Sequence, residues 1–274
     1  AEQGMPGLVA NDGSDREDAK LVVGEDTEGK EKPSRLWFSL ELSKEERETF
    51  HTSRFVPVEA LLGFRILFAF VYGALAAFSL LAPAMLTSWT QYTLGAYFIC
   101  VTVVTAKNWR KEKPVKSQTS LQSWTFLLQN VAMSLTLGVH VLFVIYLLPV
   151  DPLPLTSVFQ HLVAPYVLMI DIILSKMPAR WQHFVHGLVV VVSYGLWTII
   201  FSYSFGGGVY YFVNYKNSPN AYVILPIAIF TFTLAYFVMC AINAGAKKLD
   251  ESSNKATSAV GRDAEVEGGF TIDS

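Results

Sequence analysis

Six apolar segments, each close to 20 residues long, occupy most of the chain between residues 58 and 244 and limit what it can fold into. A helix rises about 1.5 Å per residue, so about 20 apolar residues cross the roughly 30 Å hydrocarbon core of a bilayer. A backbone in lipid must satisfy its own hydrogen bonds, which favours helices. The pattern predicts an all-α bundle of six transmembrane helices at residues 58–81, 90–106, 121–148, 157–175, 183–203 and 221–244.

The composition agrees with a membrane protein, because 52% of the residues are hydrophobic and only 16% are charged. Most charged residues lie in the first 54 and the last 28 positions. Cys100 and Cys240 fall inside apolar segments, where they form neither a disulfide framework nor a metal site. The polar residues 1–35 predict no cleavable signal peptide. We expect membrane lipids as partners, no nucleic acid and no cofactor.

Three regions follow from this charge distribution. Residues 1–54 are predicted to form a cytosolic tail, disordered to about residue 33 and then interfacial, with a short helix that begins at the capping box of Ser43 and Glu46. Residues 55–246 form the transmembrane domain, and residues 247–274 a second disordered cytosolic tail.

Basic residues in the short loops predict the orientation of the chain, since such loops face the cytosol. They follow the second, fourth and sixth segments, at Lys107, Arg110, Lys111, Lys113, Lys116, Lys176, Arg180, Lys247 and Lys248. Both termini are therefore expected in the cytosol and the loop at 206–220 outside it. The membrane is expected to be the plasma membrane or an endomembrane.

Ionisable residues within the apolar segments are expensive to bury and are therefore candidates for function. Arg65 and Asp171 have similar depths near the cytosolic side, which predicts a structural ion pair. Thr93, His140 and His161 share a second layer near the outer side. There an imidazole could take the proton of a threonine hydroxyl that attacks an ester. The more common alternative is a histidine that hydrogen-bonds other helices and a threonine that bonds its own backbone.

Two further patterns are considered and set aside. His183 and His186 share a helix face at i, i+3 spacing and could supply two metal ligands, but no third ligand is evident, so no metal is predicted. The glycines at 206–208 lack the strand and the Lys-Ser/Thr pair of a phosphate-binding loop and are interpreted as a hinge before the aromatic loop VYYFVNY.

The segment HLVAPYVLMIDIILSKMPARWQHFVH, together with WTQYT and GGGVYYF, resembles the rolling stone family. More distantly, residues 58–245 resemble the androgen-induced and androgen-dependent membrane hydrolases of fatty acid esters of hydroxy fatty acids. In those hydrolases a threonine shortly after a tryptophan in span two is the nucleophile and a histidine early in span four is its partner. The resemblance assigns these roles to Thr93, after Trp89, and to His161.

The same resemblance matches Asp171 and Arg65 to an acid and an arginine of the hydrolase pattern. We expect His140, from its depth, and Trp89 as auxiliary residues. The chain departs from the pattern at Pro165, four residues after His161, where the hydrolases have a proline at five. Thr125 also follows a tryptophan but lies on the cytosolic side, away from His161.

Two function hypotheses remain. The first is an intramembrane hydrolase of lipid esters, with Thr93 as nucleophile and His161 as base. The second is a non-enzymatic rolling stone-like membrane protein, either a factor in cell fusion or adhesion or a structural subunit of a membrane protein complex. A transporter is disfavoured, since the sequence shows no repeated half and no paired broken helices.

Overall fold

A computed structural model describes residues 38–81, 84–109, 117–148, 155–210, 213–216 and 221–267. Within these ranges the regular secondary structure is helical, apart from one isolated bridge between Ser53 and Ser175. The main helices are α2 (Val58–Ser79), α3 (Leu86–Asn108), α4 (Ser120–Leu142), α6 (Ala164–Leu174), α7 (Phe184–Phe205) and α8 (Ala221–Glu267). The prediction of an all-α fold is confirmed for the described residues.

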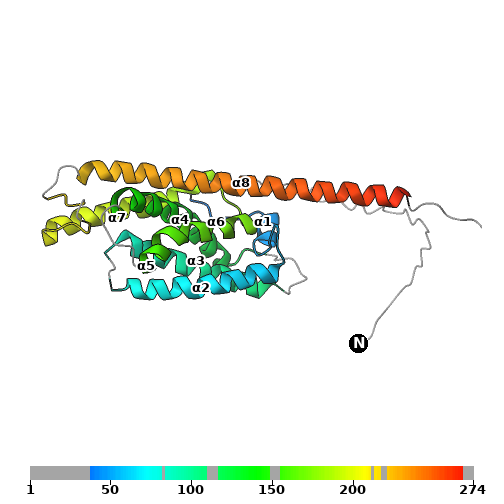
Figure 1. Cartoon of the computed structure of the whole chain (residues 1–274), viewed down its shortest axis with the longest axis horizontal. Coiled ribbons are helices and arrows are strands. Elements are labelled where there is room, and N and C mark those ends of the chain that lie inside the picture. The colour runs from blue at the N-terminus through cyan, green and yellow to red at the C-terminus, as the bar shows by residue number, and fades with distance from the viewer. Residues whose placement is uncertain are drawn as a thin grey trace, which may run out of the picture. The chain divides into compact units, whose positions relative to one another are not determined.

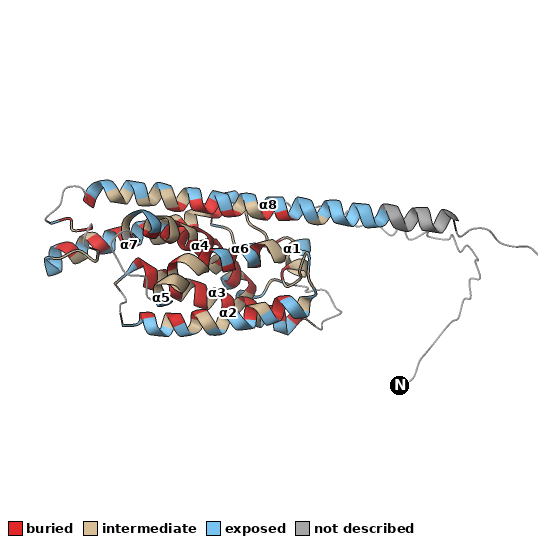
Figure 2. Cartoon of the chain, in the orientation of Figure 1, coloured by how far each residue is buried: buried red, intermediate tan, exposed pale blue. Residues whose placement is uncertain are grey.

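Helix α4 forms the centre of the bundle. It packs against α3, α6, α7 and α8, whereas α2 packs mainly against α3. Helices α2 and α8 lie at opposite edges of the bundle (Figure 1). Buried residues occupy the inner faces of the helices (Figure 2). Helix α2 and the first half of α8 expose large apolar side chains such as Phe70 and Phe230.

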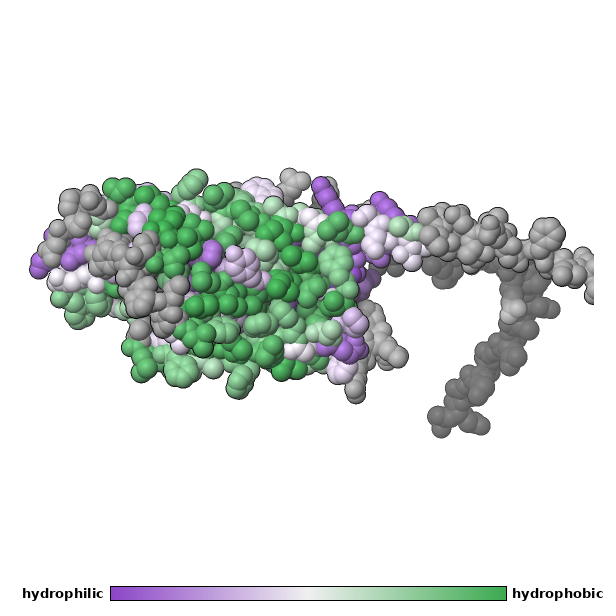
Figure 3. Space-filling model, viewed as in Figure 1, coloured by the Kyte–Doolittle hydropathy of each residue, from purple (hydrophilic) through white to green (hydrophobic). Residues whose placement is uncertain are grey.

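The exposed surface of the bundle is itself apolar. Figure 3 shows hydrophobic side chains over the middle of the helices and hydrophilic ones gathered near their ends. An apolar belt of this kind suits a lipid environment and would be unstable in water.

Among the described residues, five helices are long and apolar enough to cross a membrane, namely Val58–Ser79, Ser120–Tyr146, Leu155–Leu174, Trp181–Phe205 and Ala221–Ser258. The sequence predicts six spans. The missing one corresponds to α3, a 23-residue helix that is less apolar than the others because it contains Thr87, Gln91 and Thr105. These three side chains are buried within the bundle.

Short irregular helices interrupt or extend several of the spans. Helix α4 continues as the π-helix η1 (Phe143–Leu147), and α6 is preceded by α5 (Leu155–Ser157) and the π-helix η2 (Val158–Val163). The 3₁₀-helix η3 (Trp181–His183) precedes α7. Single π-helical turns within α-helices are often found at functional sites.

The segment before the first span belongs to the folded domain, although the sequence predicts a domain start at residue 55. Helix α1 (Lys44–Thr49) has the predicted capping box between Ser43 and Glu46. Leu42 and Phe50 are buried in the main core. The Arg54 N–H donates to the Leu174 carbonyl at 2.7 Å. Residues 1–37 lie outside the described part of the chain.

The C-terminal region also differs from the prediction of a disordered tail at 247–274. Helix α8 continues beyond the apolar segment to Glu267, and residues 268–274 lie outside the described part. An ion pair between Lys176 and Asp250, 3.5 Å apart, connects this extension to the segment after α6. Lys247 and Glu251, spaced i, i+4, add a weaker contact along the helix.

Candidate functional site

An apolar cavity of about 80 Å³ lies at the end of the bundle that holds η1 and η2. Residues from α3, α4, η1, η2, α7, α8 and the segment after α7 line it. Its polar side chains are those of Thr87, His161, Tyr194, Thr198, Tyr210 and Tyr215. Since a cavity needs about 10–15 Å³ of such volume to hold one water, this one has room for a group the size of an ester. A longer chain would have to extend between the helices.

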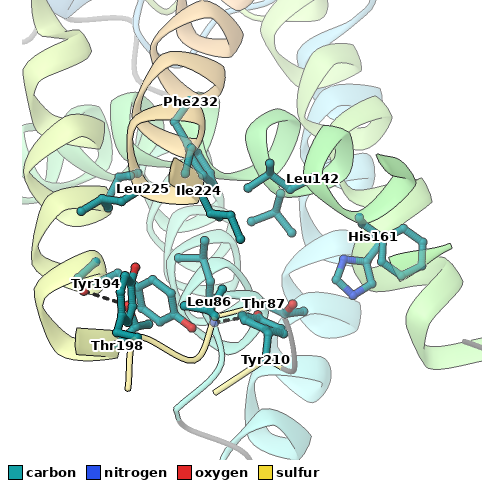
Figure 4. Close-up of a pocket in the computed structure, with 17 residues that line it drawn as sticks. Leu86, Thr87, Leu142, His161, Tyr194, Thr198, Tyr210, Ile224, Leu225 and Phe232 are labelled. Atoms are coloured by element: carbon teal, nitrogen blue, oxygen red, sulfur yellow. Dashed lines mark hydrogen bonds between the residues drawn. The ribbon is translucent and has the colours of Figure 1, made fainter. Parts of the chain in front are cut away.

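His161 is buried, and its ring forms one wall of this cavity. In the view of Figure 4 it lies on the side opposite Tyr194 and Thr198, with Leu86, Thr87 and Tyr210 between them. The ring stacks on that of Phe143, with centroids 4.0 Å apart and planes inclined by 3°. Its Nδ1 is buried and has no hydrogen-bond partner. An imidazole held in this way can exchange a proton with a molecule in the cavity.

His140 lies beside His161, as expected from their common depth. The His140 Nδ1 is 2.7 Å from the carbonyl oxygen of His161. A carbonyl can only accept a hydrogen bond, so the Nδ1 of His140 must carry the proton. The His140 ring also meets Tyr166 edge to face, 6.0 Å between centroids. His140 does not line the cavity.

The threonine predicted as nucleophile is not among the residues that line the cavity. The Thr93 hydroxyl donates to the Trp89 carbonyl of its own helix at 2.9 Å. The Trp89 ring packs edge to face against Tyr194, 5.4 Å between centroids. Trp89 therefore lies behind a cavity residue, whereas the Thr93 hydroxyl is engaged with the backbone.

Thr87 lines the cavity together with His161 and was not identified from the sequence. Thr93 comes six positions after Thr87, which places the two side chains about 120° apart around a helix of 3.6 residues per turn. The face of α3 that includes Thr87, Gln91 and Leu94 is buried. Their i, i+4, i+7 spacing was a signal in the sequence that could have pointed to Thr87.

Arg65 and Asp171 form a fully buried ion pair between α2 and α6. The Arg65 Nε donates to Asp171 Oδ1 at 2.8 Å and the Nη2 to Oδ2 at 3.3 Å. The Arg65 Nη1 also donates to the Thr105 hydroxyl at 2.6 Å, and the Tyr97 hydroxyl donates to Asp171. None of these four side chains lines the cavity. The network joins α2, α3 and α6, and its two residues from α3 were not identified from the sequence.

No metal centre is found in the described part of the chain, where His, Cys, Asp and Glu nowhere form a group of three or more that could hold an ion. The rings of His183 and His186 are 5.2 Å apart and meet edge to face. His183 also packs edge to face against Phe126 of α4. Thr125 bonds the Leu121 carbonyl of its own helix at 2.7 Å.

A second, polar cavity of about 460 Å³ lies at the other end of the bundle, between α1, the segment after α6 and α8. Several of its charged side chains pair with one another, including Arg180 with Glu46 at 2.5 Å and Lys176 with Asp250. Burial lowers the pKa of Arg54, and Asp250 opposes this shift.

Comparison with known proteins gives one result. The family model described as "Protein rolling stone" matches residues 60–267, which covers the helices α2 to α8 apart from the first two residues of α2. Neither a curated protein nor a solved structure matches the chain.

Proposed function

This chain belongs to the rolling stone family and is an integral multi-pass membrane protein. We propose that it is an intramembrane lipid-ester hydrolase and that the apolar cavity beside His161 is its active site. The observation that supports the proposal is the position of His161. Its imidazole is buried in a wall of an apolar cavity, lacks a hydrogen-bond partner at Nδ1 and shares the cavity with threonine and tyrosine hydroxyls.

The proposed reaction proceeds in two steps. In the first, a threonine hydroxyl attacks the ester carbonyl while His161 accepts its proton, and the departing alcohol then takes that proton. This leaves an acyl ester on the threonine. In the second, His161 accepts a proton from a water molecule that attacks the acyl ester, and it returns that proton to the threonine oxygen as the bond to the fatty acid breaks. The phenol groups of Tyr194 and Tyr210, which line the cavity, are suitable donors to the oxyanion.

The nucleophile has two candidates, Thr93 and Thr87, which differ in their position relative to the cavity. The family resemblance assigns the role to Thr93, whose hydroxyl must first leave the Trp89 carbonyl and turn toward the cavity. Thr87 already lines the cavity, as does His161. The geometry therefore favours Thr87, whereas the pattern of residues favours Thr93.

The substrate class follows from the surroundings of the cavity. Most of its wall is made of Leu, Val, Ile and Phe side chains, and the outer surface of the bundle is apolar. A lipid ester can therefore reach the site from the bilayer. Fatty acid esters of hydroxy fatty acids, which carry the ester in the middle of the molecule, suit a cavity that accepts only the ester and its neighbouring methylene groups.

We further propose that α3 is a sixth span and that both termini face the cytosol. Helix α3 is as long as its neighbours α2 and α4, and its polar side chains point into the bundle. An even number of spans leaves the basic segments after α3, α6 and the apolar part of α8 on one side.

The test is hydrolysis of a branched fatty acid ester by purified protein in lipid nanodiscs. Cleavage should be abolished in His161→Ala and in one of Thr87→Ala or Thr93→Ala. Thr125→Ala is the matched control, since this buried threonine on α4 does not line the cavity, and it should keep full activity. Folded wild-type protein that cleaves no ester would favour the non-enzymatic alternative, in which the polar residues only join helices.

A further inference from the structure

The backbone around His161 is irregular because Pro165 has no N–H to donate. In an α-helix, the carbonyl of residue 161 would accept from the N–H of residue 165. One residue earlier, the Ala164 N–H of a regular α-helix would donate to the carbonyl of Gln160. Here it donates to the carbonyl of Phe159 instead, as in a π-helix. Pro165, five residues after Gln160, cannot supply the π-type bond either. The proline therefore removes regular donors from two consecutive carbonyls.

Side chains from two other helices supply the missing donors. The Gln91 Nε2, from α3, donates to the Gln160 carbonyl at 3.3 Å. The His140 Nδ1, from α4, donates to the His161 carbonyl at 2.7 Å. A buried carbonyl without a partner is costly, so each contact favours a single position of the η2 backbone. Together they hold η2 between α3 and α4.

This backbone position decides where the His161 ring lies. The ring lines the cavity and stacks on the ring of Phe143, the first residue of the π-helix η1, which also lines the cavity. A shift of η2 by one residue would turn the side chain by about 100° around the helix axis and remove it from the cavity.

We propose that His140 and Gln91 are positioning residues that hold His161 in the cavity through the two carbonyls released by Pro165. His140 has the larger part, because its hydrogen bond is the shorter and is made to His161 itself. It acts through its Nδ1 proton alone and transfers none to the substrate, since its ring does not line the cavity. This inference rests on the proposed function only for its kinetic readout.

The experiment compares two substitutions at His140 in nanodisc-reconstituted protein. In His140→Asn, the side-chain amide can place an N–H near the position of Nδ1 and keep the bond to the carbonyl. In His140→Leu, the size is similar but the donor is lost. Two readouts are followed: hydrolysis of p-nitrophenyl octanoate, and the rate at which diethyl pyrocarbonate modifies His161, measured by mass spectrometry.

A positioning role predicts that His140→Leu lowers kcat by about 100-fold, as expected when a reacting group moves by about 1 Å. KM should stay close to wild type because the cavity wall is intact. The rate of His161 modification should change in the same variant, and His140→Asn should restore both readouts. Gln91→Leu should give a smaller change in the same direction.

Two results would overturn the inference. If His140→Asn is as inactive as His140→Leu, His140 itself transfers protons. If His140→Leu leaves the modification rate of His161 unchanged, the carbonyl contact does not position the ring. The second readout needs no ester cleavage, so an inactive wild-type protein would refute the proposed function and leave the positioning claim still testable.

Discussion

Replacing Asp171 by Asn should destabilise the bundle strongly, because it removes the counter-ion of Arg65 without changing the shape of the side chain. Both residues of the pair are fully buried. The carboxylate accepts two hydrogen bonds from Arg65 and one from Tyr97. Breaking a buried pair by removing one partner costs about 3–5 kcal/mol, mainly because the other charge is left unpaired. We expect a loss in this range for Asp171→Asn.

The size of the effect can be checked against an ion pair near the surface. Arg180 and Glu46 are 2.5 Å apart, but their side chains are 13% and 25% exposed. Pairs at solvent contribute at most about 1 kcal/mol. Glu46→Gln should therefore be several times less destabilising than Asp171→Asn when both are measured as unfolding in the same detergent.

A double-mutant cycle then separates the pair from its surroundings. Arg65→Leu combined with Asp171→Asn removes both charges, so the double variant should be more stable than the sum of the single losses predicts. Two results would refute the idea that an unpaired buried charge controls the stability around Arg65 and Asp171. One is that the losses of the two single variants are additive, and the other is that Asp171→Asn has the same melting temperature as the wild type.

Two further predictions concern packing and topology. Gly138→Ala should destabilise the contact of α4 with α8 by about 1–3 kcal/mol, because the new methyl group would overlap the ring of Phe232. Gly245→Ala is the control, since the space around Gly245 is open. Equal melting temperatures of the two variants would contradict this packing. Tags at both termini should resist protease added outside intact cells, while a site inserted in the loop after α7 should be cut; cleavage of either tag would overturn the proposed orientation.

The helices could be predicted from the sequence because each apolar segment is long enough to cross a bilayer and must be helical there. The pairing of Arg65 with Asp171 could also be predicted, since depth along a helix is a simple count of residues. The π-helical turn at His161 depends on which neighbouring side chains replace the lost donors of Pro165, and this is a tertiary property. The choice between Thr87 and Thr93 depends likewise on the rotation of α3.

The ends of the transmembrane domain were less predictable. Leu42 and Phe50 lie in a stretch that the sequence predicts to be interfacial, and only the packed structure shows that they are part of the core. The polar part of α8 continues as a helix where its composition indicates disorder. The helix of the last span continues directly into this polar part, and the ion pair of Lys176 with Asp250 connects it to the segment after α6. These two features explain the difference.

Labelling with a fluorophosphonate tests the central claim most directly, because this reagent forms a stable bond only with an activated hydroxyl. Wild-type protein in nanodiscs would be labelled, digested and mapped by mass spectrometry, with His161→Ala measured in parallel. The account predicts one adduct on α3, at Thr87 or Thr93, that is lost in His161→Ala. Folded wild-type protein without any adduct, or an adduct that persists in His161→Ala, would contradict it.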